Sequence, residues 1–208
     1  MLIIDIKSGV QQKTSHSMQM AAYISMALEN YDAESKKLRF NKSIKFYPKS
    51  HLYYIDGTRI LSVTQAINKN KKLSFLKEYA DRGRYIHSCC DYDDLQKLDY
   101  DKLNDYFKGF VDAWRNFKFK YNIAPDSRRI IEYRQYSEIY NYCGTIDRIY
   151  PNIAEDKIIA MNIYIKEDGS FQDIIRCDKE EYDKYLSKFL ERLRDEQLKF
   201  YKGEKHAV

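Results

Sequence analysis

The first nine residues constrain the fold most, because they read as a short apolar strand that carries two opposite charges. The run is Met1-Leu-Ile-Ile-Asp5-Ile-Lys7-Ser-Gly9. In a β-strand, residues two apart point to the same face, so Asp5 and Lys7 share one face while the apolar residues enter the other. A carboxylate beside an ammonium on a rigid strand is suited to holding a divalent cation and orienting a water or a phosphate. A salt-bridged strand on the protein surface is the alternative interpretation.

Length and composition favour one globular domain spanning 1–208. The apolar fraction of 44% and the aromatic fraction of 15% exclude a disordered chain. The net charge of +5 comes from 36 basic against 31 acidic residues, so the basic excess is mild. The lysines and arginines gather in 36–49 and 69–77, where they are placed to neutralise phosphates. A solvated face that only maintains solubility is the alternative.

Nothing in the sequence predicts a membrane protein or a secreted one. No apolar run approaches the length of a membrane span, and no signal peptide precedes the first strand. The four cysteines, Cys89, Cys90, Cys143 and Cys177, include no CxxC pair. We therefore expect reduced thiols, no membrane partner and a cytoplasmic location.

Hydrophobic periodicity and turn residues predict an α/β (α+β) fold, with a mixed central β-sheet flanked by helices. Strands are expected at 2–8, 44–61, 130–139, 143–150, 157–165 and 171–176. Helices are expected at 15–31, with Thr14 or Ser15 available as its cap, after Ser62, at 75–95 and at 101–122. A last helix is expected from a cap at Asp178 to about Tyr201, with Gly203 past its end. Asp56-Gly57 predicts a hairpin turn, and Ser62 with Gln65 predicts a capping box. The aromatic series from Phe107 to Tyr121 repeats at helical spacing, which favours a core role over base stacking.

Three carboxylates are candidates for one site: Asp5, Glu132 and Asp147. Glu132 is expected on the strand next to Asp147, although Glu138 lies on the same predicted face. Clustered carboxylates repel one another unless a cation joins them, and hard oxygen ligands favour Mg²⁺ or Mn²⁺. His87, on a predicted helix, is a candidate fourth ligand. An isolated helical histidine that only packs is the alternative for His87.

Five motifs together resemble the PD-(D/E)xK nuclease superfamily, in particular its RecB-like branch with the phage exonucleases. They are Gly83-Arg-Tyr-Ile-His87, Glu132, Gly144-Thr-Ile-Asp147, Asp5-Ile-Lys7 and Gln19-Met-Ala-Ala-Tyr23. Residues 54–64 also resemble the opening of such phage domains. The resemblance spans nearly the whole chain, and it implies a restriction-endonuclease-like core.

The order of the motifs differs from that family. There the Asp/Glu-x-Lys strand follows Gly-x-x-Asp, whereas here a strand–helix block at 1–35 precedes the remainder of the domain at 44–208. Neighbouring strands lie about 4.8 Å apart, so a connection that passes over the position of one strand must span about 10 Å. The connection at 151–157 can extend to about 20 Å, which is enough. We therefore expect the displaced strand to enter the gap after Asp147, within one chain or in a segment-swapped dimer or other homo-oligomer.

The resemblance implies a metal-dependent deoxyribonuclease, an exonuclease in recombination, repair or viral DNA processing, with RNA also open as a substrate. It assigns metal ligation to Asp5, Asp147, Glu132 and His87, catalysis to these three acids with Lys7, and DNA contact to Gln19, Tyr23, Arg82 and Arg84. It also suggests a virus-encoded protein. For Gln19 and Tyr23, packing against a sheet edge is the alternative, and for the two arginines it is simple solvation.

Two other functions remain open at this point. The displaced block would leave a non-catalytic DNA-binding module if it misaligned the carboxylates by an ångström or more. An iron–sulfur nuclease is disfavoured by the cysteine spacing.

Overall fold

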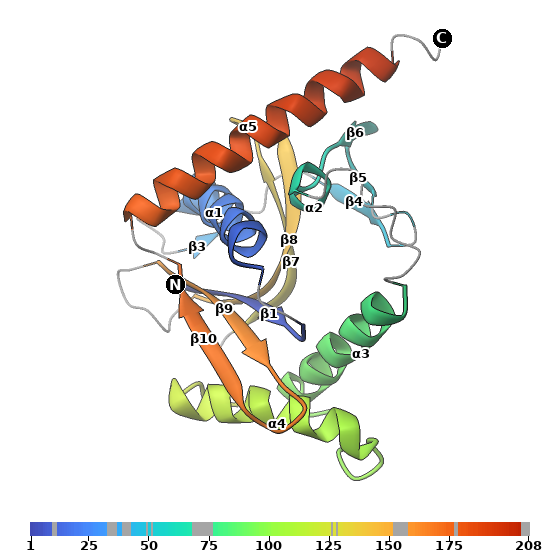
Figure 1. Ribbon diagram of the computed structural model, residues 1–208, viewed down its shortest axis with the longest axis vertical. Coiled ribbons are helices and arrows are strands. Elements are labelled where there is room, and N and C mark those ends of the chain that lie inside the picture. Colours follow the sequence, from blue (N-terminus) through green and yellow to red (C-terminus); the bar gives the residue numbers. More distant parts are fainter. Residues whose placement is uncertain are drawn as a thin grey trace. The chain divides into compact units, whose positions relative to one another are not determined.

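The computed structural model describes residues 1–9, 12–32, 37–38, 43–48, 50, 52–67, 77–125, 127, 129–151, 158–176 and 179–204 (Figure 1). The chain forms two compact units, each drawn from three stretches of sequence. The first unit comprises Met1–Gln11, Lys72–Ile131 and Asp147–Ile175. The second comprises Gln12–Lys71, Glu132–Ile146 and Arg176–Val208.

A mixed five-stranded sheet has the order β10-β9-β1-β8-β7. Its strands are β1 (Leu2–Lys7), β7 (Ile130–Ser137), β8 (Tyr142–Tyr150), β9 (Ile159–Ile165) and β10 (Phe171–Ile175). Leu2 lies opposite Tyr150 of β8 in an antiparallel pairing and opposite Ile159 of β9 in a parallel one. The predicted mixed sheet with helices is confirmed. The N-terminal strand occupies the gap after β8, as expected, and its own chain supplies it.

β1 is buried on both faces, which corrects the expectation of one polar face. Ile4 and Ile6 enter the main core of the first unit, while Ile3 and Asp5, on the opposite face, are 0% and 1% exposed. The sequence of a central strand that is covered on both faces is typically a nearly continuous apolar run. Leu2–Ile6 has such a sequence, with Asp5 as its single polar residue. The ion pair considered as the alternative for Asp5 and Lys7 does form, with the Asp5 side chain 2% and the Lys7 side chain 19% exposed.

Two helices complete the first unit. α3 (Lys77–Asp94) and α4 (Asp105–Lys120) contact one another, and α4 also packs on β9 and β10 (Figure 1). Asn104 caps α4 by accepting a 3.0 Å hydrogen bond from the Tyr106 N–H, so the helix begins later than the predicted residue 101. Phe110, Trp114 and Phe117 are buried in the core, which confirms the core role of the aromatic series.

The second unit is built from three helices and two small sheets. The helices are α1 (Lys13–Asn30), α2 (Val63–Ile67) and α5 (Lys179–Glu204), and α5 packs along α1 and α2 (Figure 1). β2 (Tyr31–Asp32) pairs with β3 (Lys37–Leu38), and β4 (Ile44–Tyr47), β5 (Leu52–Ile55) and β6 (Thr58–Ile60) form a meander. None of the described helices is long and apolar enough to cross a membrane.

Local signals in the second unit had mixed outcomes. Asp56 and Gly57 both have positive φ, +50° and +82°, as the predicted hairpin turn requires. Ser62 and Gln65 form the predicted capping box, each side chain bonding the other's backbone N–H. The expected Thr14 or Ser15 cap of α1 is wrong. Gln12 is the N-cap residue, and the His16 ring accepts its N–H at 3.4 Å.

Several sequence expectations fall on positions outside the described residues. These are the Asp178 cap, Cys177, the connection at 152–157, four basic residues of the stretch 36–49 (Lys36, Arg39, Lys42 and Lys49) and the lysines at 69, 71 and 72. Cys89, Cys90 and Cys143 are free and buried, in agreement with reduced thiols. The last helix continues to Glu204 and so includes Gly203, which was expected beyond its end.

Candidate active site

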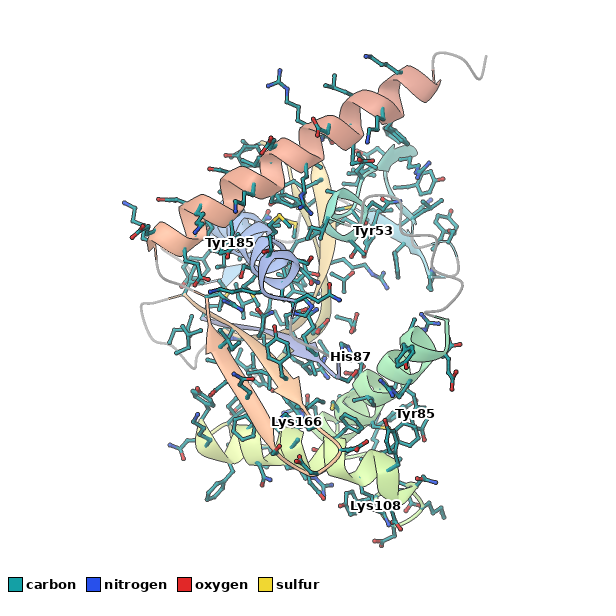
Figure 2. The ribbon with its side chains drawn as sticks, in the orientation of Figure 1. Tyr53, Tyr85, His87, Lys108, Lys166 and Tyr185 are labelled. Carbon is teal, nitrogen blue, oxygen red and sulfur yellow. The ribbon has the colours of Figure 1, made fainter. Side chains whose placement is uncertain are left out.

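The peptide group of Ile6 joins three sequence-distant motifs in the first unit. Its N–H donates to a carboxylate oxygen of Asp147 at 2.7 Å, and its carbonyl oxygen accepts from Nε2 of His87 at 3.1 Å. The other ring nitrogen of His87, Nδ1, lies 3.8 Å from the Asp147 carboxylate. The middle residue of Asp5-Ile6-Lys7 thus fixes an imidazole nitrogen beside a carboxylate (Figure 2 labels His87 on α3).

The side chains of Asp5 and Lys7 form a buried ion pair on the same strand. Nζ of Lys7 lies 2.9 Å from Oδ1 and 2.8 Å from Oδ2 of Asp5. Asn162, directly opposite Asp5 on β9, donates to Oδ2 at 2.7 Å. The Asp5 side chain is 2% exposed and that of Lys7 19%, so one edge of the pair is open to solvent.

Asn162 is a site residue that the sequence reasoning missed. It is completely buried in β9, a strand whose other members, apart from the Tyr164 hydroxyl, are apolar. A lone amide in such a run is a detectable signal, because buried polar groups need a hydrogen-bonding partner. Its partner is the Asp5 carboxylate, and this bond aims the carboxylate toward Lys7.

The pKa shifts at the ion pair show that the site has excess negative charge. Burial raises the pKa of Asp5, and the nearby charge of Asp147 raises it further although Lys7 opposes the shift. Burial alone would lower the pKa of Lys7, yet the carboxylates of Asp5 and Asp147 raise it overall. Both groups therefore hold their protons more tightly than in water. Two carboxylates matched by one ammonium form a donor set that suits a hard divalent cation.

A second charged cluster lies directly behind Asp147. Arg148, which is fully buried, donates from Nε to Asp94 at 2.9 Å and also pairs with Asp91. Asp91 and Asp94 are both on α3, and Asp91 lies one helical turn after His87. Arg148 therefore ties the strand segment that carries Asp147 to the helix that carries His87. The sequence reasoning did not identify this cluster, whose signal is the acidic run at 91–94.

Gly144 permits close packing in the second unit, as its missing side chain suggested. A Cβ atom there would lie 3.0 Å from the Tyr23 ring and 3.1 Å from Met26, both on α1. Gln19 donates to the hydroxyl of Tyr23 at 2.8 Å, and Tyr23 is 3% exposed. Tyr23 thus packs against β8, an interior strand of the sheet and not the edge considered as the alternative, and Gln19 orients its hydroxyl.

The two predicted arginines differ. Arg84 is exposed and pairs with Asp81 of its own helix. Arg82 instead donates to the hydroxyl of Tyr106 on α4 at 3.2 Å, and its guanidinium lies 4.9 Å from the centre of the Tyr79 ring. Aromatic side chains therefore hold Arg82 in place. Among the described residues, no carboxylate forms a salt bridge with Arg82, whereas Asp81 neutralises the charge of Arg84.

Glu132 begins the part of β7 that belongs to the second unit, so it is described by itself. Its side chain is exposed, and β7 neighbours β8 in the sheet, as expected. Its φ of +51° lies in the left-handed region, which is uncommon for a residue within a strand and typical of bulged or functional positions. Glu138, the alternative acid, lies beyond the end of β7.

No family model, curated protein or solved structure matches this chain. The assignment of a function therefore rests on the residues and their geometry.

Proposed function

We propose that this chain is a metal-dependent nuclease that hydrolyses phosphodiester bonds in DNA, with a PD-(D/E)xK-type site. One observation carries the proposal: Ile6 hydrogen-bonds to both Asp147 and His87. Three motifs that the resemblance assigns to one site, and that are separated by up to 141 residues, meet at this one peptide group. A chance set of weak motifs gives no reason for that convergence.

The proposed metal ligands are Asp5, Asp147 and Glu132, with His87 as a further donor. Asp147 and His87 offer an oxygen and a nitrogen side by side, and the raised pKa values of Asp5 and Lys7 indicate a site that attracts cations. Glu132 is included among the proposed ligands because it matches the sequence pattern and because its backbone has a positive φ. A bound Mg²⁺ or Mn²⁺ would offset phosphate charge and make a water more acidic.

The remaining residues act through charge and position. Because its pKa is raised, Lys7 stays protonated at neutral pH, so it is poorly suited to remove a proton. Its ammonium is instead placed to orient the attacking water and to stabilise negative charge that develops on the phosphate. Asn162 holds the Asp5 carboxylate, and the Ile6 N–H holds that of Asp147, so both acids are oriented before substrate binds.

Incubation of labelled linear and circular DNA with Mg²⁺, Mn²⁺ or EDTA tests the proposal, with RNA as a parallel substrate. We expect metal-dependent cleavage, and cleavage of linear DNA alone would identify an exonuclease. Lys7→Ala should lower the rate roughly 100- to 1,000-fold while DNA binding is largely retained. Lys102→Ala is the matched control, since Lys102 is 84% exposed and pairs only with Asp99 in the described structure.

The result that would refute catalysis is metal-independent binding of DNA without cleavage by the purified protein. That outcome would favour the non-catalytic DNA-binding module. Full activity of Lys7→Ala would remove Lys7 from the mechanism.

A further inference from the structure

A hollow of about 520 Å³ opens where β1 ends, entirely within the first unit. Its wall is formed by Ser8 and Gly9, which directly follow Lys7, by Arg82 of α3, and by Tyr106 and Phe110 of α4. The turn from Lys166 to Asp168, which joins β9 to β10, closes another side (Figure 2 labels Lys166). A volume of this size is typical of sites for single small molecules.

The hollow adjoins the end of the strand that carries Lys7. Tyr164 lines it and is also the residue of β9 that lies opposite Lys7 in the parallel pairing. Ser8 is the next residue along the chain from Lys7. A phosphodiester held beside Lys7 would therefore have one of its two nucleosides at the mouth of this hollow.

The charges around the hollow cancel. Arg82 and Lys166 contribute two positive charges, and Glu167 and Asp168 contribute two negative ones. A site for a phosphate would need a positive excess. A balanced wall is better suited to an uncharged group that brings its own hydrogen-bonding atoms.

The rest of the lining combines the rings of Tyr106, Phe110 and Tyr164 with the side chains of Ile165 and Gln172. Tyr106 is 37% exposed and meets the Phe110 ring edge to face, with 5.5 Å between ring centres. Nε of Arg82 is buried and has no hydrogen-bond partner among the described residues. An exposed ring beside a guanidinium that can stack or donate is a common way to hold a base of a single strand.

We propose that this hollow takes one unpaired nucleobase with its sugar, from the nucleotide next to the phosphate that is cleaved. The inference rests on the proposed function and adds to it the form of the substrate. A base within a duplex is stacked and paired, so it must leave the helix to enter a hollow of this size. The site therefore prefers single-stranded DNA, or an unpaired end, over intact duplex.

The surface next to the hollow offers further aromatic side chains on which unpaired bases can stack. A second hollow, which Arg82 also lines, is bordered by the rings of Tyr79, Tyr85 and Phe107 and by the acids Glu78 and Asp81, with Tyr79 56% and Tyr85 48% exposed. Arg82 lines both hollows, so it lies between two aromatic surfaces. Successive unpaired bases have rings to stack on at each side of it.

Equilibrium binding of a labelled oligonucleotide, as a single strand and as a blunt duplex, tests the inference in EDTA, where cleavage is absent. The wild-type protein should bind the single strand more tightly. Tyr106→Leu removes the ring but keeps an apolar side chain, and it should weaken single-strand binding roughly 5- to 150-fold with little effect on the duplex. Tyr106→Phe keeps the ring and should bind nearly as the wild type does.

Phe119→Leu is the matched control, because Phe119 is on the same helix, is 86% exposed and does not line the hollow. It should leave binding unchanged. Equal binding of single strand and duplex by the wild type, or unchanged single-strand binding by Tyr106→Leu, would overturn the inference while metal-dependent cleavage still stood. Failure of the wild type to cleave or bind any nucleic acid would overturn the proposed function as well.

Discussion

At the scale of single residues, the site places the carboxylates of Asp5 and Asp147 close together, and a bound cation would offset their repulsion. The Asp5 carboxylate is buried close to the charge of Asp147. Burial raises its pKa most, Lys7 opposes the shift and Asp147 adds to it. Asp5 is therefore protonated more easily in the metal-free fold than in the unfolded chain. Its contribution to stability is complete below its unfolded pKa and is lost as the pH rises through the raised folded value.

The raised pKa of Asp5 predicts how metal binding depends on pH. A metal ligand must be deprotonated, so protons compete with Mg²⁺ at Asp5 up to a higher pH than at an ordinary aspartate. The rise in the thermal unfolding midpoint that Mg²⁺ causes should be small near pH 4 and should grow toward pH 8. Thermal melts in Mg²⁺ and in EDTA across this range measure it. Asp5→Asn is the control and should respond little to Mg²⁺ at any pH.

The buried Arg148 cluster predicts a large effect on stability. Arg148→Ala would leave Asp94, whose side chain is 0% exposed, without one of its two cationic partners. Removing one member of a buried ion pair typically costs about 3–5 kcal/mol. Arg115→Ala should cost about 1 kcal/mol or less, because Arg115 pairs with Asp93 of the same cluster but is 42% exposed. Urea denaturation measures both, and equal losses would contradict a special role for Arg148.

The residues at this site differ in how far the sequence predicted them. Asp5, Lys7, His87 and Asp147 were found because their spacing follows a motif, and the structure brings these four together. Asn162 was missed because its role depends on strand register, which sequence spacing does not define for a parallel pair. Arg148 and Asp91 were missed because they stabilise the site from behind and belong to no motif.

At the scale of elements, local rules predicted the boundaries that local chemistry determines. The Asp56-Gly57 turn and the Ser62–Gln65 box each need only a few neighbouring residues, and both are confirmed. The cap of α1 was wrong because the helix starts at Lys13 after Gln12, whose side chain makes no capping hydrogen bond, while the His16 ring accepts the Gln12 N–H. The burial of both faces of β1 follows from its central place in the sheet, which no local pattern reveals.

Two helical glycines, Gly109 of α4 and Gly83 of α3, should differ in how replacement by alanine changes the stability of the protein, because only Gly109 lies against the β9–β10 turn. A Cβ at Gly109 would lie 1.6 Å from the carbonyl oxygen of Glu167, so Gly109→Ala must push the turn from the helix. We expect a loss of about 1–3 kcal/mol. A Cβ at Gly83 meets only the Ser8 hydroxyl at 3.6 Å, so Gly83→Ala should be neutral or stabilise by up to about 1 kcal/mol. Chemical denaturation compares them, and a more stable Gly109→Ala would disprove the close contact.

At the scale of the whole molecule, the order of segments in the sequence differs from their order in the sheet. β1 comes first in the chain but lies between β8 and β9, so Tyr150, Leu2 and Ile159 follow one another across three adjacent strands. β1 is stabilised by its pairing with β8 and β9, and this pairing is the same whether β1 is connected to the chain at the N-terminus or after β8. The fold should therefore tolerate a change of connection better than the loss of the strand.

A rearranged chain tests this directly. Residues 1–32 are moved to follow Tyr150 and are joined onward by a flexible linker to residue 158. Because Leu2 lies opposite Tyr150 in an antiparallel pairing, a hairpin loop of about 2–5 residues suffices at the first junction. The parallel β1–β9 pair needs a crossover, which α1 and the linker provide.

We expect the rearranged protein to give the circular dichroism spectrum of the original and to retain metal-dependent cleavage that Lys7→Ala lowers to the same extent as in the original chain. Deletion of residues 1–9 is the control for the strand itself. It removes the partner of both β8 and β9 from the middle of the sheet, and should leave a chain without a cooperative unfolding transition. A rearranged chain that stays unfolded with linkers of several lengths would show that β1 depends on its N-terminal position, and not only on its neighbours in the sheet.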